Sequence, residues 1–178
     1  MLILASQSPR RKELLKKIVN DFKIVPADVD EHLDVDIKEL PKEAALLKAK
    51  TIKKLYPNDD VLGCDTVVII DNKLLGKPKD EQEAFDMLKE LSGRDHLVIS
   101  GYAYLKGDEV IARSVTTVVH FNELSDELIK EYIKTGSPMD KAGAYGIQDE
   151  EFHLVRCIEG SMDNVIGLPT EDILQHWF

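Results

Sequence analysis

The chain has 178 residues, of which 43% are hydrophobic and 31% are charged, and its net charge is −10. This composition is typical of a soluble globular protein, and we expect residues 1–178 to form one domain with a sizeable core. The negative charge argues against a nucleic-acid polymer as partner, because such a binder needs a basic face. No apolar run approaches the ~20 residues of a membrane helix. The N-terminal apolar run stops at Ala5 with no basic region before it, which predicts a cytoplasmic protein.

Apolar periodicity predicts both strands and helices along the chain. Strands are expected over 2–5, 22–27, 61–70, 73–75, 96–105, 109–121 and 152–158. Helices are expected over 9–19, 39–56, 81–91, 126–134 and 170–177, with Ser8, Asp80 and Ser125 as caps. The strands in the middle of the chain have the pattern of antiparallel neighbours. We therefore expect a mixed α/β fold, an elongated mixed sheet flanked by helices.

Two arginines, Arg10 and Arg11, lie in the first turn of the first expected helix, directly after the cap Ser8 and Pro9. The unpaired N–H groups of a helix start attract anions, and the helix dipole adds to this effect. Cations there are unfavourable unless something negative accompanies them. The stretch therefore fits a phosphate-type site, but it fits equally well side chains that extend into water or pair with nearby acids.

An acid inside an apolar strand is the second candidate. Asp65 lies in Gly63-Cys64-Asp65-Thr66-Val67-Val68, where a buried carboxylate costs several kcal/mol unless it is paired or metal-bound. Such acids hold a cation or take a proton from water, and this interpretation is favoured over a structural aspartate. Lys48 lies on the apolar stripe of the expected helix 39–56 and should lean toward the core. An inward lysine needs an anion, although its stem can also run along the core with the charge in water.

Two loops carry further candidates. Lys77 stands between Gly76 and Pro78, after the hairpin expected from strands 61–70 and 73–75 with its turn at 71–72. This position would present the Lys77 side chain to a phosphate, but a four-residue turn is a weak signal. The small residues of the loop 141–148 let the backbone approach a ligand, and Gln148 can read a base edge with a donor and an acceptor.

The remaining candidates concern metals. Asp28, Asp30 and Glu31 form an acidic patch whose oxygen atoms suit Mg²⁺, although acidic loops are more often only solvated. Cys64 and Cys157 have no metal-binding or redox spacing and are expected to be buried small side chains.

Taken together, the motifs resemble those of the Maf family of nucleoside triphosphate pyrophosphatases. Each block alone is unspecific, but they occur in the family's order and span nearly the whole chain. The matching blocks are 4–11, Val29-Asp30-Glu31, Lys48-Ala49, 63–68, Leu75-Gly76-Lys77-Pro78, 140–148 and Asn164-Val165-Ile166-Gly167-Leu168-Pro169.

The resemblance implies a fold like that of the inosine triphosphate pyrophosphatases, with two lobes and a central cleft. It implies an enzyme that hydrolyses dTTP and UTP, and modified pyrimidine nucleotides in addition, to the monophosphate and pyrophosphate with a divalent metal, Mg²⁺ or Mn²⁺. The roles it implies are catalysis by Asp65, Lys48 and Lys77, metal binding by Glu31 and Asp65, and substrate binding by Ser8, Arg10, Arg11, Thr66, Lys141 and Gln148. Arg11, Thr66 and Gln148 resemble the specificity positions of the dTTP/UTP branch.

Two positions depart from the family pattern. Cys64 stands where alanine is common, and Asp149 follows Gln148 where the family usually has glycine, which affects the end of the loop. An alternative function is a nucleotide-binding regulator of cell division, since the family's name derives from inhibition of septum formation. The sequence leaves the oligomeric state open, a homodimer included.

Overall fold

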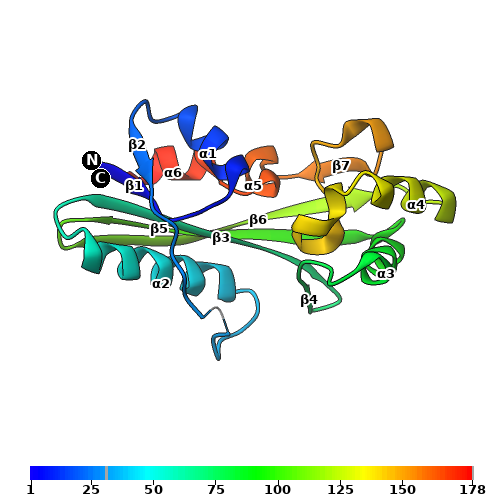
Figure 1. Ribbon diagram of the computed structural model, residues 1–178, viewed down its shortest axis with the longest axis horizontal. Coiled ribbons are helices and arrows are strands. Elements are labelled where there is room, and N and C mark those ends of the chain that lie inside the picture. The colour runs from blue at the N-terminus through cyan, green and yellow to red at the C-terminus, as the bar shows by residue number, and fades with distance from the viewer. Residues whose placement is uncertain (31, 178) are drawn as a thin grey trace. The chain divides into compact units, whose positions relative to one another are not determined.

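The computed structural model describes residues 1–30 and 32–177, and within them seven strands form one mixed sheet (Figure 1). The order of neighbours is β2-β1-β3-β5-β6-β7, and β4 pairs with β3. β1 is parallel to β2 and β3, whereas β4 is antiparallel to β3 and β7 is antiparallel to β6. The strands are β1 Leu2–Leu4, β2 Phe22–Ile24, β3 Asp60–Ile70, β4 Lys73–Leu75, β5 Asp95–Lys106, β6 Glu109–Phe121 and β7 Val155–Glu159.

Helices follow the strands in most places that the sequence indicates. The α-helices are α1 Pro9–Lys16, α2 Leu40–Leu55, α3 Glu81–Leu91, α4 Asp126–Lys134, α5 Met162–Ile166 and α6 Thr170–His176. The 3₁₀ helices are η1 Ser137–Asp140, η2 Ala142–Ala144 and η3 Glu150–Phe152. None of the helices in the described part of the chain is long and apolar enough to cross a membrane.

The chain divides into two compact units, each built from separate stretches. Unit 1 comprises residues 1–66, 99–115 and those from 163 onward, and unit 2 comprises 67–98 and 116–162. Strands β3, β5 and β6 each contribute residues to both units. Whether the chain behaves as one domain, as the sequence predicts, stays a prediction.

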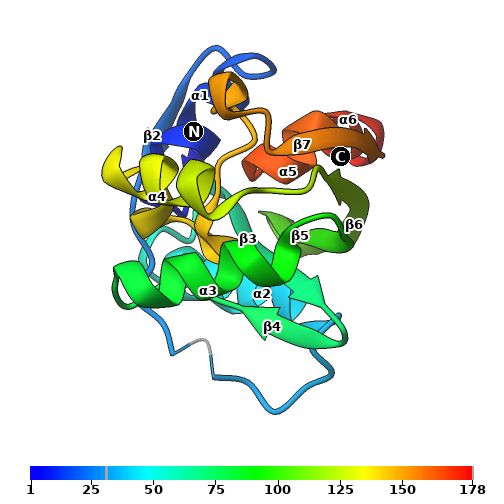
Figure 2. The same cartoon turned by 90° about the vertical axis from the view of Figure 1, so that its right-hand side faces the viewer.

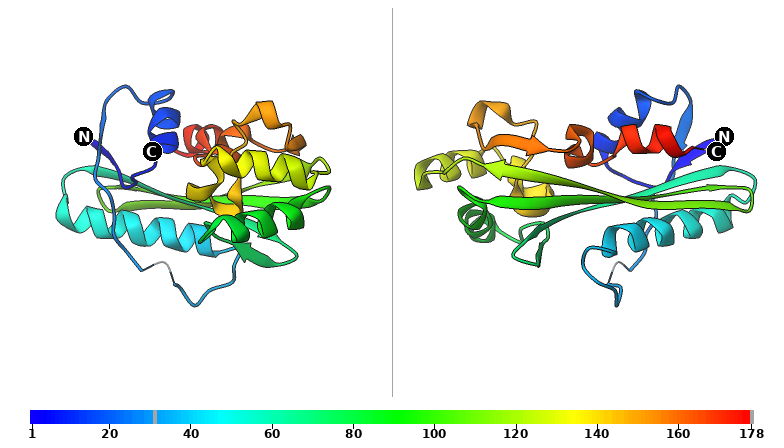
Figure 3. Two further views of the ribbon diagram at one scale, coloured as in Figure 1. Left: turned by 45° about the vertical axis from the view of Figure 1, so that its right-hand side comes forward. Right: turned by 180° about the vertical axis from the view of Figure 1, so that it is seen from behind.

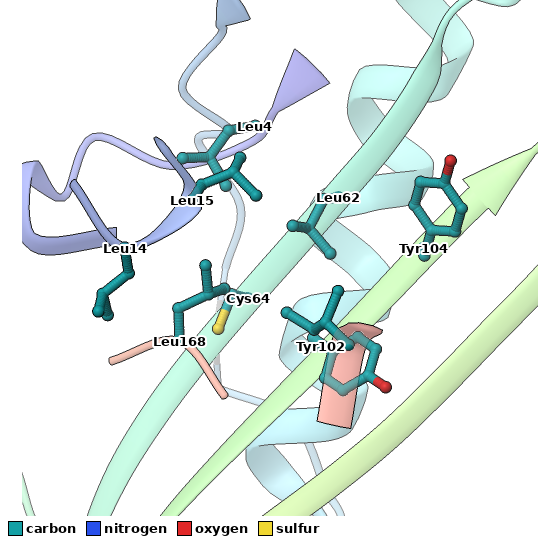
Figure 4. Packing of buried hydrophobic residues seen from close by; sticks show 9 residues of the cluster. Leu4, Leu14, Leu15, Leu62, Cys64, Tyr102, Tyr104 and Leu168 are labelled. Carbon is teal, nitrogen blue, oxygen red and sulfur yellow. The ribbon is translucent and has the colours of Figure 1, made fainter. Parts of the chain in front are cut away.

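Unit 1 has helices on both faces of its strands. α2 covers one face, and α1 and α6 cover the other (Figures 1 and 3). Each face has its own buried cluster, and burying each leucine or isoleucine side chain contributes roughly 1.5–3 kcal/mol. The α2 side contains Ile3, Ala5, Ala45, Ala49, Ile52, Val61, Ala103 and Leu105. The α1 and α6 side contains Leu4, Leu14, Leu15, Leu62, Cys64, Tyr102, Tyr104, Leu168 and Ile173, most of which are labelled in Figure 4.

Two glycines allow α2 to approach its strands closely. A Cβ atom on Gly63 would lie 2.3 Å from the carbonyl oxygen of Ala45, and one on Gly101 would lie 2.2 Å from the backbone nitrogen of Lys42. Any other residue would push the helix away from the sheet. This close approach brings the inner face of α2, including Lys48, directly against β3.

Unit 2 is organised around α3 and α4, which pack against each other (Figure 2). Both helices begin as the sequence predicts: Asp80 accepts a hydrogen bond from the Glu83 N–H at 2.8 Å, and Ser125 accepts one from the Leu128 N–H at 3.2 Å. The 3₁₀ helices η1 and η2 lie against α3, so the irregular segment after α4 is also packed.

The structure differs from the expectations mainly at the ends of elements and after residue 136. α1 ends at Lys16 rather than at 19, and β7 begins at Val155 rather than at 152. The segment 160–169, for which the sequence indicates a loop or a short helix, contains the short helix α5. Cys64 is buried as expected, but Cys157 is exposed, so that expectation was wrong. Cys157 lies on β7, which has the sheet neighbour β6 on one side only, and water therefore reaches it.

Candidate functional site

Asp65 and Lys48 form an ion pair inside unit 1. Asp65 lies on β3 and Lys48 on the inner face of α2, and the distance from Lys48 Nζ to Asp65 Oδ1 is 3.3 Å. The two side chains are only 13% and 10% exposed, and the ammonium also donates to the backbone carbonyl of Cys64 at 3.4 Å. The predicted inward lysine is thus confirmed, and the anion beside it is the carboxylate that the sequence picked out. A pair this shielded from water is screened by salt far less than a surface pair.

Arg11 is held by uncharged oxygen atoms. Its Nε donates to the carbonyl of Gly167 at 2.8 Å, Nη1 to Ser6 Oγ at 3.3 Å and Nη2 to Thr66 Oγ1 at 3.1 Å. A guanidinium has five N–H groups, and three of those of Arg11 donate to these oxygen atoms. None of its partners is a carboxylate, and its charge is therefore oriented without being neutralised.

The Gly167 carbonyl gathers several of these side chains. Besides Arg11, it accepts from Thr66 Oγ1 at 3.3 Å and from Cys64 Sγ at 3.3 Å. Burial raises the pKa of the Cys64 thiol, so the thiol keeps its proton and can act as donor. Thr66 Oγ1 also lies 2.7 Å from Ser100 Oγ. Gly167 has φ +139°, a conformation that other residues rarely adopt, which explains glycine at this point of the loop.

The start of α1 has the predicted cap. Ser8 accepts from the Arg11 N–H at 3.3 Å, Pro9 occupies the first turn, and this turn contains no acidic residue. Arg10 lies on the same turn and is half-buried. The structure therefore joins Ser8, Arg11 and Thr66 in one network, and pairs Lys48 with Asp65 on the adjacent stretch of β3.

The other predicted residues, Lys77, Lys141 and Gln148, belong to unit 2. The Gly143 N–H donates to the Gly76 carbonyl at 3.1 Å, which ties the loop 141–148 to the turn that carries Lys77. Lys77 and Gln148 are exposed, and neither side chain has a hydrogen bond or ion pair with another described residue. Lys141 Nζ donates to the Ser137 carbonyl at 2.7 Å and to Asp140 Oδ1 at 3.0 Å.

The acidic patch of Asp28, Asp30 and Glu31 is only partly described by the structure. Glu31 lies outside the described residues, and Asp30 accepts from the His32 N–H at 2.9 Å. Within residues 1–30 and 32–177, no group of three or more His, Cys, Asp or Glu side chains could hold a metal ion. Asp65 offers a hard carboxylate donor, and Mg²⁺ needs only one or two protein carboxylates when waters and phosphates complete its shell. The donor chemistry therefore fits Mg²⁺ or Mn²⁺ brought in with a phosphate ligand.

Three contributors to this network were not predicted: Gly167, Ser100 and Ser6. Gly167 lies in the block 164–169, whose only signal in the sequence is the family resemblance. It is 156 positions from Arg11, too far along the chain for a local pattern to connect them. Ser100 interrupts the apolar run of β5, and a buried hydroxyl in such a run needs a partner; that signal could have identified it.

Known proteins similar to this chain include a family and a solved structure. The model of the family described as "Maf-like protein" matches residues 1–177. The solved structure of the Staphylococcus aureus Ham1 protein superposes with a TM-score of 0.52 at 15% identity, covering 86% of this chain and 90% of that one. This likeness concerns the fold alone, and it confirms the expected inosine triphosphate pyrophosphatase-like sheet with flanking helices.

Relatives with a higher sequence identity than the Ham1 protein carry the name dTTP/UTP pyrophosphatase. The dTTP/UTP pyrophosphatase of Thermococcus gammatolerans is 50% identical over 173 residues, covering 97% of this chain and 93% of that protein. The protein of the same name from Symbiobacterium thermophilum is 48% identical, covering 98% and 91%. The one from Thermosipho africanus is 49% identical, covering 97% and 89%.

Proposed function

Because the chain belongs to the Maf family, we propose that it is a hydrolase that converts dTTP and UTP to the nucleoside monophosphate and pyrophosphate. Relatives of that name share about half of the residues across nearly the full length of both proteins. Modified pyrimidine nucleotides are proposed as further substrates.

The observation that carries the proposal is the buried pair of Asp65 and Lys48, together with an Arg11 guanidinium that uncharged oxygen atoms hold in place. A triphosphate ester needs a base or an orienting group for water, and cations for the oxygen atoms that gain charge. Unit 1 contains side chains of both kinds: Asp65 pairs with the Lys48 ammonium, and the next residue, Thr66, accepts a hydrogen bond from the Arg11 guanidinium.

Asp65 orients the attacking water and takes its proton. The water oxygen forms a bond to the α-phosphorus, the bond from that phosphorus to the bridging oxygen breaks, and pyrophosphate leaves. Lys48 keeps the carboxylate in place and contacts the phosphate oxygens, and Arg11 stabilises the charge that they gain. Ser8 and Arg10 bind the phosphate chain at the start of α1.

The remaining roles are proposed from the family resemblance. Lys77 and Lys141 contact phosphate, and Thr66 and Gln148 bear on the base. Asp65 and Glu31 would hold Mg²⁺ or Mn²⁺, which would neutralise charge on the phosphates when bound. A cytoplasmic location is proposed as well.

The decisive experiment incubates the purified chain with a panel of natural and modified nucleoside triphosphates and Mg²⁺ or Mn²⁺, and identifies the products. The proposal expects pyrophosphate together with dTMP or UMP. Orthophosphate as the first product would identify a general phosphatase and contradict it.

Nucleotide binding without turnover would instead support the regulatory protein that the sequence left open. A buffer without divalent metal is the matched control for the metal, because activity should return when Mg²⁺ or Mn²⁺ is added. Size-exclusion chromatography with light scattering tests the homodimer.

A further inference from the structure

Asp149, the position where the family pattern has glycine, holds the end of the loop 141–148 in unit 2. Its Oδ2 atom accepts a hydrogen bond from the hydroxyl of Tyr132 and another from the hydroxyl of Ser137, both at 2.6 Å. Tyr132 is a fully buried residue of α4, and Ser137 begins η1. One carboxylate therefore joins the end of the loop to two elements that precede it in the chain.

Each of the two hydroxyls also accepts a hydrogen bond from the loop. The Tyr132 hydroxyl accepts from the Gly146 N–H at 2.9 Å, and Ser137 Oγ accepts from Lys141 Nζ at 3.1 Å. A hydroxyl has one proton, and here both protons are donated to Asp149, so the lone pairs face the loop donors. Burial and the Asp149 carboxylate raise the pKa of the Tyr132 phenol, which keeps its proton in place.

The loop closes tightly around these contacts. A Cβ atom on Gly146 would lie 2.8 Å from Lys141 Cε and 3.2 Å from Asp149 Oδ2, so the Lys141 stem crosses directly over Gly146. The Asp149 N–H donates to the Gly146 carbonyl at 3.0 Å, which closes the turn that carries Gln148. Chains of hydrogen bonds that end on an ionised group are stronger than neutral ones, because each bond polarises the next.

We propose that Asp149 is a positioning residue for substrate binding. Through Tyr132 it fixes the backbone that presents Gln148, and through the Ser137 hydroxyl it adds to the hold of the Ser137 carbonyl and Asp140 on the Lys141 ammonium. The inference rests on the proposed function, in which Lys141 and Gln148 meet the substrate.

The first test measures the position of Lys141 without substrate. The wild type and Asp149→Ala are treated with an amine-acylating reagent, and labelling is followed for each lysine by peptide mass spectrometry. Loss of the carboxylate should raise the labelling rate of Lys141 about threefold or more, and Lys134, exposed at the end of α4, should be unchanged as internal control. Equal labelling of Lys141 in both proteins would overturn the proposal.

The second test measures kcat and KM for dTTP and UTP. Asp149→Ala should raise KM about tenfold, the scale of a lost hydrogen bond to a charged group, and change kcat less than about threefold. Asp149→Asn keeps an oxygen acceptor for both hydroxyls and should recover most of the KM. Asp126→Ala, which removes the ion pair from Lys89 to α4, is the control for a loss of stability in the same unit.

The outcomes separate the two proposals. If the wild type releases no pyrophosphate from dTTP or UTP, the proposed function fails, and the labelling experiment still decides the arrangement around Asp149. If labelling changes but KM does not, or if Asp126→Ala raises KM equally, Asp149 has a structural role only and the positioning proposal is wrong.

Discussion

The two units organise their candidate functional side chains around different acceptors. In unit 1 the acceptor is the Gly167 carbonyl, a neutral backbone group that receives donors from Arg11, Thr66 and Cys64. In unit 2 it is the Asp149 carboxylate, which acts through two hydroxyls within residues 132–149. The first arrangement joins residues far apart in the sequence, and the second is local.

The difference shows how a protein can orient a cation in two ways. A backbone carbonyl does not titrate, and no substitution of a side chain removes it, so this contact of Arg11 is fixed by the fold, whereas its contacts to Ser6 and Thr66 depend on side chains. A carboxylate orients its neighbours more strongly but adds a negative charge near Lys141 and depends on a single residue. Under the proposed function, the arrangement in unit 1 orients groups that take part in the chemistry, and that in unit 2 adjusts substrate affinity.

The largest effect should follow the removal of Asp65, the proposed general base in unit 1. Asp65→Asn should lower kcat for pyrophosphate release by about 10³-fold, since general bases contribute typically 10²–10⁴-fold. Nucleotide affinity should change little, because the cations remain. Steady-state kinetics and a binding isotherm measure the two quantities.

Asp60→Asn is a control on the same strand, since Asp60 accepts from the Tyr104 hydroxyl and an amide oxygen can do the same. Full turnover in Asp65→Asn would remove Asp65 from the mechanism. The assignment of the chemistry to unit 1 and of substrate affinity to unit 2 would then fail.

The next effect concerns stability in unit 2. Burial lowers the pKa of His96 from 6.5 to about 4, so the folded protein keeps this imidazole neutral where the unfolded chain would protonate it. The unfolded chain binds more protons between pH 6.5 and about 4. The contribution of His96 is therefore complete above pH 6.5 and is lost as the pH falls through this window, by at most about 3 kcal/mol.

Urea unfolding of the wild type and His96→Gln at pH 7.5 and pH 4.5 checks this expectation. Asp and Glu residues titrate in both proteins, so the difference between the two pH dependences isolates His96. If the free energy of unfolding changed equally with pH in the two proteins, the neutral, buried state of His96 would not contribute to the pH dependence of stability.

A smaller effect is expected where the geometry of Arg11 is broken but its charge is kept. Arg11→Lys loses the fork that joins Gly167, Ser6 and Thr66, and kcat/KM for dTTP should fall about 30-fold, or ~2 kcal/mol. Lys12→Arg is the matched control at the neighbouring exposed position. If Arg11→Lys kept as much activity as the control Lys12→Arg, a positive charge at position 11 would be sufficient. The role assigned to the Gly167 carbonyl would then be wrong.

The smallest effect belongs to the surface of unit 2. The hydrogen bonds that the His120 imidazolium donates to the carboxylates of Glu159 and Asp95 raise the pKa of His120 above 6.5. The stabilisation is complete below pH 6.5 and disappears as the pH rises through the folded value, the opposite sign from His96. His120→Gln should therefore lower the melting temperature slightly at pH 6 and leave it unchanged at pH 9, as thermal scans would show.

The sequence predicts much of the fold because local signals decide it. The caps Ser8, Asp80 and Ser125, the hairpin turn at 71–72 and the apolar stripes place most elements within a few residues. The sequence does not predict the 3₁₀ helices η1 and η2, because these turns depend on packing against α3 rather than on periodicity.

For the candidate site, residue chemistry predicted Lys48 and Asp65, since a buried charge requires a partner of opposite sign. The Gly167 carbonyl could not be predicted in this way, because a backbone acceptor carries no side-chain signal and its donors are distant along the chain.

The composition of unit 1 from three stretches has a consequence for biosynthesis. Ile173 of α6 packs in the same cluster as Leu14 and Leu15 of α1, and Gly167 receives the Arg11 guanidinium. A ribosome must therefore translate past residue 173 before the first helix acquires its final neighbours. Until then, the nascent chain exposes the leucines of α1, and premature termination before α6 would yield a product that chaperones and proteases treat as incomplete.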